Sequence, residues 1–298
     1  MRAWILLLAF ATALVGCGRS DPPTPAPTPV NVIANAARGS DCEALPFEPS
    51  TPVPEASGAA WLTIDGALRL VVAGDSGNHG AYGVIDPDSG KTLEQGQLPL
   101  NGSTDDIEGL AARGDRLFGI TSPGWILEWE RSGNGFTLVA GPYALGPVDL
   151  PPKGGMGDKP PVGNGMVCDG TRSNCGRNYE GLCLTGHAGY VASKADGHLY
   201  PVTGDDKLVV DSAGAIAVAD PGHLADCAYD AGTLYVGNNL FGLSTVSRVV
   251  DGKVLPIASI GVGFPEVLAV RGDVFYRMSD TGSTPSLMSK FRCSASAR

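Results

Sequence analysis

The sequence has few charged residues, and acidic residues outnumber basic ones. Charged residues make up 17% of the 298-residue chain, with 21 Lys and Arg against 31 Asp and Glu, which gives a formal net charge of −10. We see no basic stripe, and an acidic surface repels nucleic acid and anionic lipid. We therefore expect no nucleic-acid partner, and a preference for cations and for cationic or neutral ligands.

Several patterns that identify common enzyme classes are missing. The sequence has no Gly-x-Ser-x-Gly nucleophile turn, no His-Glu-x-x-His zinc motif and no phosphate-binding loop. It also lacks a Cys-x-x-Cys pair, which argues against a zinc site, and it shows no long helical periodicity. It is instead rich in turn-forming residues, with 42 Gly and 23 Pro.

The first residues resemble a bacterial lipoprotein signal. Arg2 is followed by an apolar run, residues 4–15, that is too short to span a bilayer. The run ends Leu14-Val15-Gly16-Cys17, which resembles a lipobox, where the Cys is acylated with chains such as palmitate and the peptide is cut before it. We expect residues 1–16 to be the signal peptide and Cys17 to be the lipidation site. An ordinary signal peptide with an incidental Cys is the alternative.

Residues 17–41 are predicted to form the lipid anchor and a linker. The segment Pro22–Pro29 alternates Pro with small residues, which favours an extended, solvated spacer. Gly18 stands where an Asp would resemble an inner-membrane retention signal. We therefore expect an outer-membrane lipoprotein of the bacterial cell envelope, facing the periplasm or the outside. Its lipid would anchor it in the membrane.

A repeat occurs five times in the remaining sequence. An apolar residue is followed by a turn Gly four or five positions later and by a large apolar residue at eight. The copies are Leu62–Gly66–Leu70, Leu110–Gly114–Phe118, Leu182–Gly186–Tyr190, Cys227–Gly232–Tyr235 and Leu268–Gly272–Tyr276. They start 48, 72, 45 and 41 residues apart, and spacings of 40 to 50 residues are typical of β-propeller blades. The long interval contains a Pro- and Gly-rich insert at about residues 141–177.

The repeat predicts an all-β domain over residues 42–298, a β-propeller of five four-stranded blades. Six blades is the alternative count, and a β-sandwich or β-helix is the competing fold. In the second repeat, four strands are predicted at Glu108–Ala112, Arg116–Thr121, Trp125–Glu130 and Phe136–Ala140. After Leu268 only three strands fit, so a strand near Glu43–Phe47 is expected to complete the last blade and close the ring.

Six cysteines remain once Cys17 carries lipid, and an even number in an exported chain predicts disulfides. Ring closure brings Cys42 beside Cys293, Cys168 and Cys175 share one loop, and Cys183 and Cys227 lie on inner strands of neighbouring blades. We expect these three pairs, although six cysteines allow fifteen connectivities.

Two copies of the repeat carry a sharper motif, Asp106-Ile107-Glu108-Gly109-Leu110-Ala111 and Asn178-Tyr179-Glu180-Gly181-Leu182-Cys183. This motif resembles the esterase-like phytase family and equally the SdiA-regulated family. The resemblance implies a calcium-associated six-bladed propeller. The chain departs from it by its Cys-containing insert and by the lack of a sixth repeat.

Polar residues recur at two positions that a propeller brings to one face. Loops that enter the inner strands carry Asp106, Glu108, Glu180, Asp226 and Glu266. Loops between second and third strands carry Asp75, Ser76, Asn78, His79, Ser122, Lys194, Asn238, Asn239 and Asp280. Carboxylate and amide oxygens from separate loops are the ligand set of Ca²⁺. Glu108 and Glu180 are the first candidate ligands, followed by Asp226, Glu266, Asp75 and Asn238. A structural role, accepting hydrogen bonds from the backbone of the next blade, is the alternative.

We interpret the domain as a binding module with an acidic central face that takes Ca²⁺ and an unidentified protein or small-molecule ligand. The alternative, which only the family resemblance implies, is a Ca²⁺-assisted hydrolase of esters or phosphoesters. His79, in the turn-rich segment Gly74–Gly80, is the candidate catalytic base for that reaction.

Overall fold

The computed structural model describes residues 42–101, 105–146, 176–240, 243–282 and 285–294, all of which belong to one compact unit, Ile33–Arg298. The predictions for residues 1–16 and 17–41, and those for Cys17, Cys168 and Cys175, lie outside the described residues. In the described part of the chain, no helix has the length and apolar character needed to cross a membrane.

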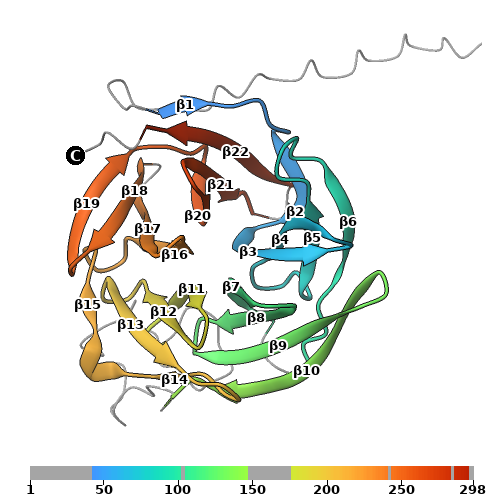
Figure 1. Cartoon of the computed structure of the whole chain (residues 1–298), viewed down its shortest axis with the longest axis horizontal. Coiled ribbons are helices and arrows are strands. Elements are labelled where there is room, and N and C mark those ends of the chain that lie inside the picture. Colours follow the sequence, from blue (N-terminus) through green and yellow to red (C-terminus); the bar gives the residue numbers. More distant parts are fainter. Residues whose placement is uncertain (1–41, 102–104, 147–175, 241–242, 283–284, 295–298) are drawn as a thin grey trace, which may run out of the picture. The chain divides into compact units, whose positions relative to one another are not determined.

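Five antiparallel sheets form a ring, so the chain is a five-bladed β-propeller, as predicted (Figure 1). Blade 1 consists of β3 (Ala56–Ile64), β4 (Ala67–Gly74), β5 (Ala81–Ile85) and β6 (Thr92–Gln97). Blade 2 consists of β7 (Ile107–Arg113), β8 (Arg116–Thr121), β9 (Trp125–Ser132) and β10 (Gly135–Ala144). Blade 3 consists of β11 (Tyr179–Thr185), β12 (Ala188–Ser193), β13 (His198–Thr203), β14 (Val209–Val210) and β15 (Ile216–Ala217), with the 3₁₀ turn Ser212–Gly214 between the last two.

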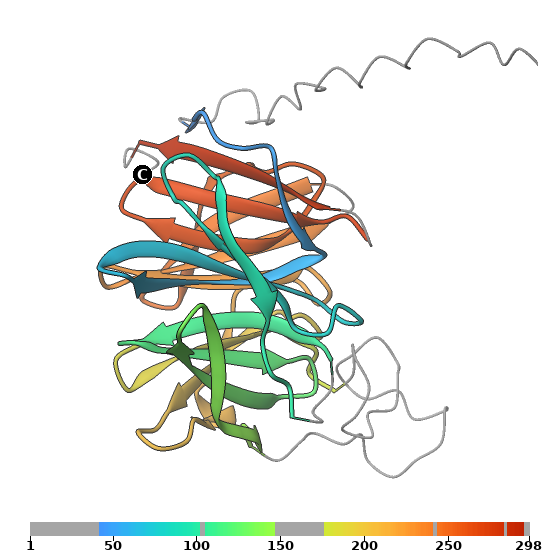
Figure 2. The ribbon, with the colours of Figure 1, turned by 90° about the vertical axis from the view of Figure 1, so that its right-hand side faces the viewer.

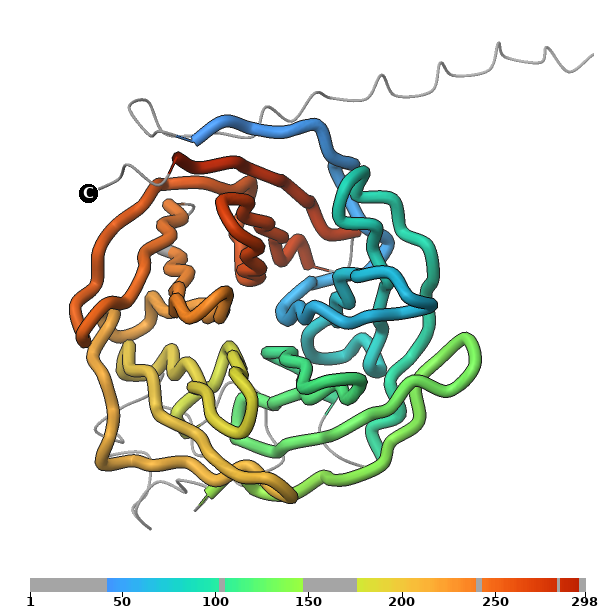
Figure 3. The backbone as a smooth tube through the Cα atoms, viewed as in Figure 1, coloured from blue at the N-terminus to red at the C-terminus, as the bar shows by residue number. Residues whose placement is uncertain are grey.

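The last two blades complete the ring. Blade 4 consists of β16 (Leu224–Asp230), β17 (Thr233–Leu240), β18 (Leu243–Val250) and β19 (Lys253–Ala258). Blade 5 consists of β20 (Phe264–Arg271), β21 (Val274–Asp280), β22 (Pro285–Cys293), β1 (Cys42–Ala44) and β2 (Ser50–Pro54). The first strand of each blade, β3, β7, β11, β16 or β20, lies nearest the centre of the ring (Figure 3). The strands twist across one another from the inside of a blade to its outside (Figure 2).

The N-terminal segment closes the ring. β1 pairs with β22, with Cys42 opposite Cys293, and the two residues form a disulfide with an S–S distance of 2.03 Å. The closing strand was predicted at Glu43–Phe47 and occurs at Cys42–Ala44, and β2 pairs with β22 as well. The prediction of ring closure by an N-terminal strand and a Cys42–Cys293 disulfide is therefore confirmed.

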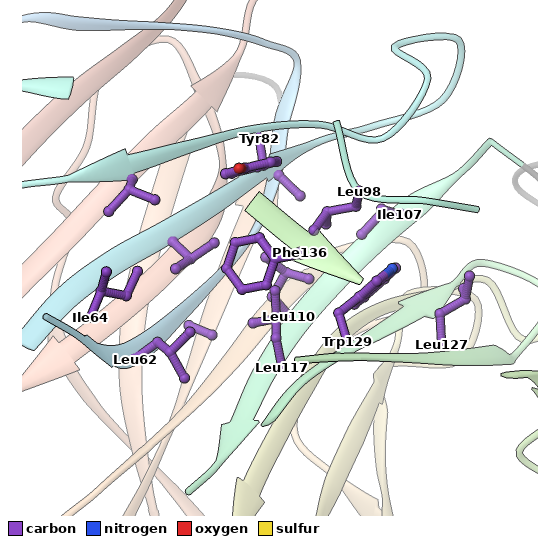
Figure 4. Packing of buried hydrophobic residues seen from close by; sticks show 14 residues of the cluster. Leu62, Ile64, Tyr82, Leu98, Ile107, Leu110, Leu117, Leu127, Trp129 and Phe136 are labelled. Atoms are coloured by element: carbon purple, nitrogen blue, oxygen red, sulfur yellow. The ribbon is translucent and has the colours of Figure 1, made fainter. Parts of the chain in front are cut away.

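The core lies between neighbouring blades, because alternate residues of each strand face opposite sides of its sheet. In β4, Val71 and Ala73 pack toward blade 2, whereas Leu70 and Val72 pack toward blade 5. Between blades 1 and 2, Trp129 is fully buried and packs in one cluster with Leu110, Leu117 and Phe136 (Figure 4). Its indole N–H donates to the carbonyl of Pro99 over 2.9 Å.

The turn glycines of the repeat occupy the hairpins between the first two strands of the blades. Gly66, Gly114, Gly186, Gly232 and Gly272 all have positive φ, between 57° and 85°. In blade 1, however, the residue equivalent to Leu110 of blade 2 is Ala59 rather than Leu62, since each of the two lies two residues after the one that its strand pairing skips. The first repeat was therefore placed three residues too late, because β3 is longer than the other inner strands before its turn.

The segment predicted as an insert begins later than expected. β10 continues to Ala144, so Gly141–Ala144 form part of blade 2 instead of the insert. The four strands predicted for the second repeat are otherwise confirmed, as β7 to β10.

Candidate functional site

A β-bulge occurs at the same point of every inner strand. In each pairing with the second strand, one residue is passed over: Ser57, Glu108, Glu180, Ala225 and Glu266. A bulge turns the side chain of its extra residue out of the alternation of the strand. Three of the five bulge residues are therefore glutamates at equivalent positions around the ring centre.

A second set of equivalent residues ends the second strands. On each second strand, the residue paired with the one just before the bulge is followed by Asp75, Ser122, Lys194, Asn239 or Asp280. We call these five residues, the five bulge residues and their near neighbours in sequence Asp106, Asn178 and Asn238 the polar mouth. The sequence predicted that both groups lie on one face, and members of the two groups do meet: oxygens of Asp75 and Glu108 lie within 4.8 Å of each other, and Lys194 Nζ lies 2.8 Å from Glu180 Oε2.

Glycines follow three of the bulges because the inner strands approach one another closely there. A Cβ on Gly58 would lie 2.7 Å from the backbone N of Leu110, and a Cβ on Gly109 would lie 2.7 Å from that of Leu182. A Cβ on Gly181 would lie 2.5 Å from Asp226 Oδ1. The Glu-Gly-Leu motif therefore combines a carboxylate aimed at the mouth with a contact between blades.

Three carboxylates form a compact cluster between blades 1 and 2. Asp75, Asp106 and Glu108 each supply an oxygen, and these oxygens all lie within 4.8 Å of one another. The side chains of Asp106 and Glu108 are buried, at 1% and 2% exposure, whereas Asp75 is half-buried. Since Ca²⁺ binds oxygens at about 2.3–2.6 Å, oxygens this close can share one ion.

Two oxygens of this cluster have no hydrogen-bond donor within the described part of the chain. They are Asp106 Oδ1 and Glu108 Oε1. The other oxygen of Asp106 accepts from the backbone N and the hydroxyl of Ser122. A buried carboxylate oxygen without a donor is unfavourable unless a cation binds it or a proton satisfies it, and the side chains of Asp106 and Glu108 lie close enough to share a proton. Asp106 had been placed at the mouth from the sequence, but not among the metal ligands.

Burial and like charge raise the pKa values of the cluster. Burial raises the pKa of Asp75 to about 7 and that of Asp106 to about 6. The pKa of Glu108 lies well above its usual value, through burial first and then through the charges of Glu180 and Asp75. The carboxylates therefore compete for protons, and a divalent cation would relieve the same repulsion.

Lys194 neutralises the opposite part of the mouth. Its Nζ lies 2.8 Å from Glu180 Oε2 and 3.3 Å from Glu266 Oε1. Asn178 Nδ2 donates to the other oxygen of Glu180 over 2.6 Å. Burial tends to lower the pKa of Lys194, but the charges of Glu180 and Glu266 outweigh it and hold the pKa above its usual value. Glu180 and Glu266, both predicted metal ligands, are thus bridged by the ammonium group of Lys194.

Asp226 takes a different place from that expected of a metal ligand, whereas the role predicted for Asn238 stays a prediction. Asp226 lies one residue beyond the bulge, at the position of Gly109 and Gly181. Its two oxygens accept from the backbone N–H groups of Cys227 and of Leu268 in the next blade, each over 2.7 Å. This contact is the structural alternative anticipated for these carboxylates. Asn238 Oδ1 is buried and, among the residues described, has no donor.

His79 lies in an exposed loop. Its side chain is 79% exposed, and its Nδ1 lies 2.9 Å from Asp105 Oδ2. Asp105 also accepts from the backbone N–H of His79, over 2.8 Å. These contacts hold His79 against Asp105 in its turn.

The other end of the ring centre is apolar. A cavity of about 110 Å³ there is lined by three consecutive residues of every inner strand, among them Ala111, Cys183 and Ala228. Cys183 and Cys227 form the predicted disulfide between β11 and β16. The centre of the propeller therefore has one acidic end and one apolar end.

Comparison with known proteins supports the fold. The structure is similar to the glutaminyl cyclase of Myxococcus xanthus, with a TM-score of 0.52 and 14% identity, over 85% of this chain and 97% of that one. It also matches the PQQ-bound aldose sugar dehydrogenase of Streptomyces coelicolor, with a TM-score of 0.46 and 13% identity, over 87% of this chain and 100% of that one. At such identity the likeness extends to the fold alone.

No protein-family model and no curated protein matches the chain. The resemblance to the esterase-like phytase and SdiA-regulated families is therefore without support from these comparisons. The five sheets also differ from the six blades that the resemblance implied. The class that the structure defines is the five-bladed β-propeller with an acidic centre.

Proposed function

We propose that the protein is a calcium-binding module that is held on the bacterial envelope by a lipid on Cys17. The Ca²⁺ site consists of Asp75, Asp106 and Glu108, on blades 1 and 2 of the polar mouth. The ion orders the acidic face, which then presents its remaining coordination positions to a neutral or cationic ligand. The observation that carries the proposal is the pair of buried oxygens, Asp106 Oδ1 and Glu108 Oε1, for which the described residues supply no donor.

The composition of the mouth favours a cation over an organic anion. Three amide oxygens are also buried and have no donor within the described ranges: Asn178 Oδ1, Asn238 Oδ1 and Asn239 Oδ1. Among the amide nitrogens of these three residues, only Asn239 Nδ2 is buried without an acceptor in the same ranges. A surplus of oxygen acceptors, several of them charged, is the chemistry that hard cations select. Three carboxylates supply at least three of the six to eight ligands that Ca²⁺ takes, so positions remain for water and a ligand.

The envelope location is part of the same proposal. The two disulfides fit a protein folded outside the cytoplasm. The lipobox-like sequence at Cys17 and the Pro-rich linker before Cys42 support attachment to the outer membrane, at a distance from the bilayer.

The hydrolase expected as the alternative has weaker support. It needs a base beside the ion, and His79, the candidate base, contacts Asp105 in an exposed loop. The binding module is the function that the geometry favours.

Calorimetric titration of Ca²⁺ into the full chain tests this function. We expect one ion per chain in the wild type and at least a tenfold loss of affinity in Glu108→Gln, which keeps the size of the side chain but removes its charge. Asp65→Asn is the matched control, because Asp65 is an exposed carboxylate in the β3–β4 turn with a φ of 51° that Asn accepts. Equal binding by Glu108→Gln and the wild type would rule out the site.

A further inference from the structure

We propose that the polar mouth contains two cation positions and that the chain fills one of them itself, with the ammonium group of Lys194. The second position lies between Glu180 and Glu266 and becomes a divalent-metal site when the ammonium group is removed. Lys194 thereby determines how many ions the protein binds. This inference deepens the proposed calcium function, since both positions share one mouth, but its test gives a separate result.

The first argument is the place of the ammonium group. Glu180 belongs to blade 3 and Glu266 to blade 5, and blade 4 lies between them in the ring. The bulge residue of blade 4 is Ala225, whose methyl group is the smallest side chain of that set. Because no long side chain rises from that bulge, Lys194 Nζ reaches both glutamates, at 2.8 and 3.3 Å. The space left by Ala225 is thus a position that holds a cation.

The second argument is the equivalence of the two positions. Each mouth residue from a second strand can be matched with the bulge residue of the next blade in the ring. Asp75 of blade 1 is matched in this way with Glu108 of blade 2, and Lys194 of blade 3 with Ala225 of blade 4. Asp75 is an acid, so the first position has three carboxylates and, among the described residues, no Lys or Arg that bonds to them. Lys194 is a base, so the second position has its own cation.

The third argument is that the second position retains metal ligands when the ammonium is absent. Glu180 and Glu266 are buried, at 2% and 6% exposure. Asn178 Nδ2 holds one oxygen of Glu180, and Asn178 Oδ1 is itself a buried acceptor without a donor in the described part of the chain. Two buried carboxylates deprived of their counter-ion must either take up a proton or bind another cation. Ca²⁺ is suited to this place because it accepts carboxylate and amide oxygens in flexible geometry.

Ion counting on the full chain tests the inference. Equilibrium dialysis against Ca²⁺ should give one bound ion for the wild type and two for Lys194→Met, which keeps the aliphatic stem and removes the charge. Lys290→Met is the matched control, because Lys290 Nζ bonds to the carbonyl oxygens of Pro87 and Asp88, without a carboxylate. The control should keep the wild-type count. An unchanged count in Lys194→Met would overturn the inference.

A combined variant separates this inference from the calcium site on blades 1 and 2. Lys194→Met with Glu108→Gln should bind one ion, whereas Glu108→Gln alone should bind none. If the wild type binds no ion but Lys194→Met binds one, the proposed calcium function fails and the inference stands. If Lys194→Met and Lys194→Gln both remain unfolded in millimolar Ca²⁺, the inference fails, because the ion should replace the ammonium group.

Discussion

Glu180 and Asp226 occupy neighbouring positions of the repeat but have different partners. Glu180 is a bulge residue and bonds to Lys194, whereas Asp226 lies one residue further and bonds to the backbone of the next blade. A carboxylate at the bulge thus faces the mouth, whereas a carboxylate one residue further along the strand bonds to the next blade. From the sequence the two looked alike, because the bulge that separates them is not visible in the residue pattern.

Loss of the Asp226 carboxylate should destabilise the fold. Asp226→Ala leaves the buried N–H groups of Cys227 and Leu268 without their acceptor, and a buried donor without a partner costs about 1–3 kcal/mol. Asp226→Asn keeps one acceptor oxygen and should cost less. Urea unfolding measures both, and an Ala variant as stable as the Asn variant would contradict the assigned role.

The raised pKa values predict how the stability of the Ca²⁺-free protein depends on pH. Burial raises the pKa of Asp75 to about 7 and that of Glu180 to about 8, so the folded state binds more protons than the unfolded state above about pH 4. The stabilisation is complete below the unfolded pKa values and is lost as the pH rises through the folded ones. The free energy of unfolding, measured in chelator, should decline from pH 5 to 8 by up to roughly 1.4 kcal/mol per pH unit for each extra proton bound in the folded state.

If the wild type in chelator is more stable at pH 8 than at pH 5, the pKa values of the mouth carboxylates are not raised by folding and the prediction is wrong. Glu180→Gln should flatten the decline, since it removes one titrating group from the buried set.

At the scale of the strand, the glycines that follow three of the five bulges fix the distance to the next blade. Gly109→Ala would place a Cβ 2.7 Å from the backbone N of Leu182, so blade 2 and blade 3 would have to separate. Overpacking of this kind costs about 1–3 kcal/mol. Gly135→Ala is the control, because its nearest heavy atom lies 3.9 Å from the added Cβ and its φ is not positive. Thermal unfolding should show a clear loss for Gly109→Ala alone; equal melting temperatures would contradict the account.

The strands were predictable from the sequence where the repeat is regular. The four strands of the second repeat were placed to within a few residues, because Gly114 and the alternation of apolar residues mark its hairpin. The first repeat was placed three residues too late, since β3 runs on to Ile64 before its turn and Leu62 imitates the phase of Leu110. Local spacing does not reveal how far a strand extends before its partner begins.

The cluster of Asp75, Asp106 and Glu108 was only partly predictable, for a related reason. Asp75 and Glu108 were expected as ligands, but Asp106 was not, and the sequence could not show that Lys194 would take up Glu180 and Glu266. These partners depend on which blades are neighbours and on the small size of Ala225. Both are properties of the assembled ring.

At the scale of the whole molecule, two disulfides link parts of the ring that are distant in sequence. Cys42–Cys293 spans 251 residues and joins the ends of the domain, whereas Cys183–Cys227 spans 44 residues and joins blades 3 and 4. The chain-entropy model gives about 5.5 kcal/mol for the longer loop and about 4 kcal/mol for the shorter.

Removal of the closing disulfide should therefore destabilise the propeller more than removal of the other. The double variant Cys42→Ala/Cys293→Ala should lose the larger free energy of unfolding in urea, with Cys183→Ala/Cys227→Ala as the comparison. β1 and β2 still pair with β22 without the disulfide, so the ring should remain folded. An unchanged free energy in the first variant would show that strand pairing alone closes the ring.

A crystal of the protein soaked in Ca²⁺ tests the central claim most directly. Anomalous scattering should place one ion within about 2.3–2.6 Å of oxygens of Asp75, Asp106 and Glu108, with Lys194 still between Glu180 and Glu266. Calcium found only at surface carboxylates, with these three side chains free of metal, would contradict the account.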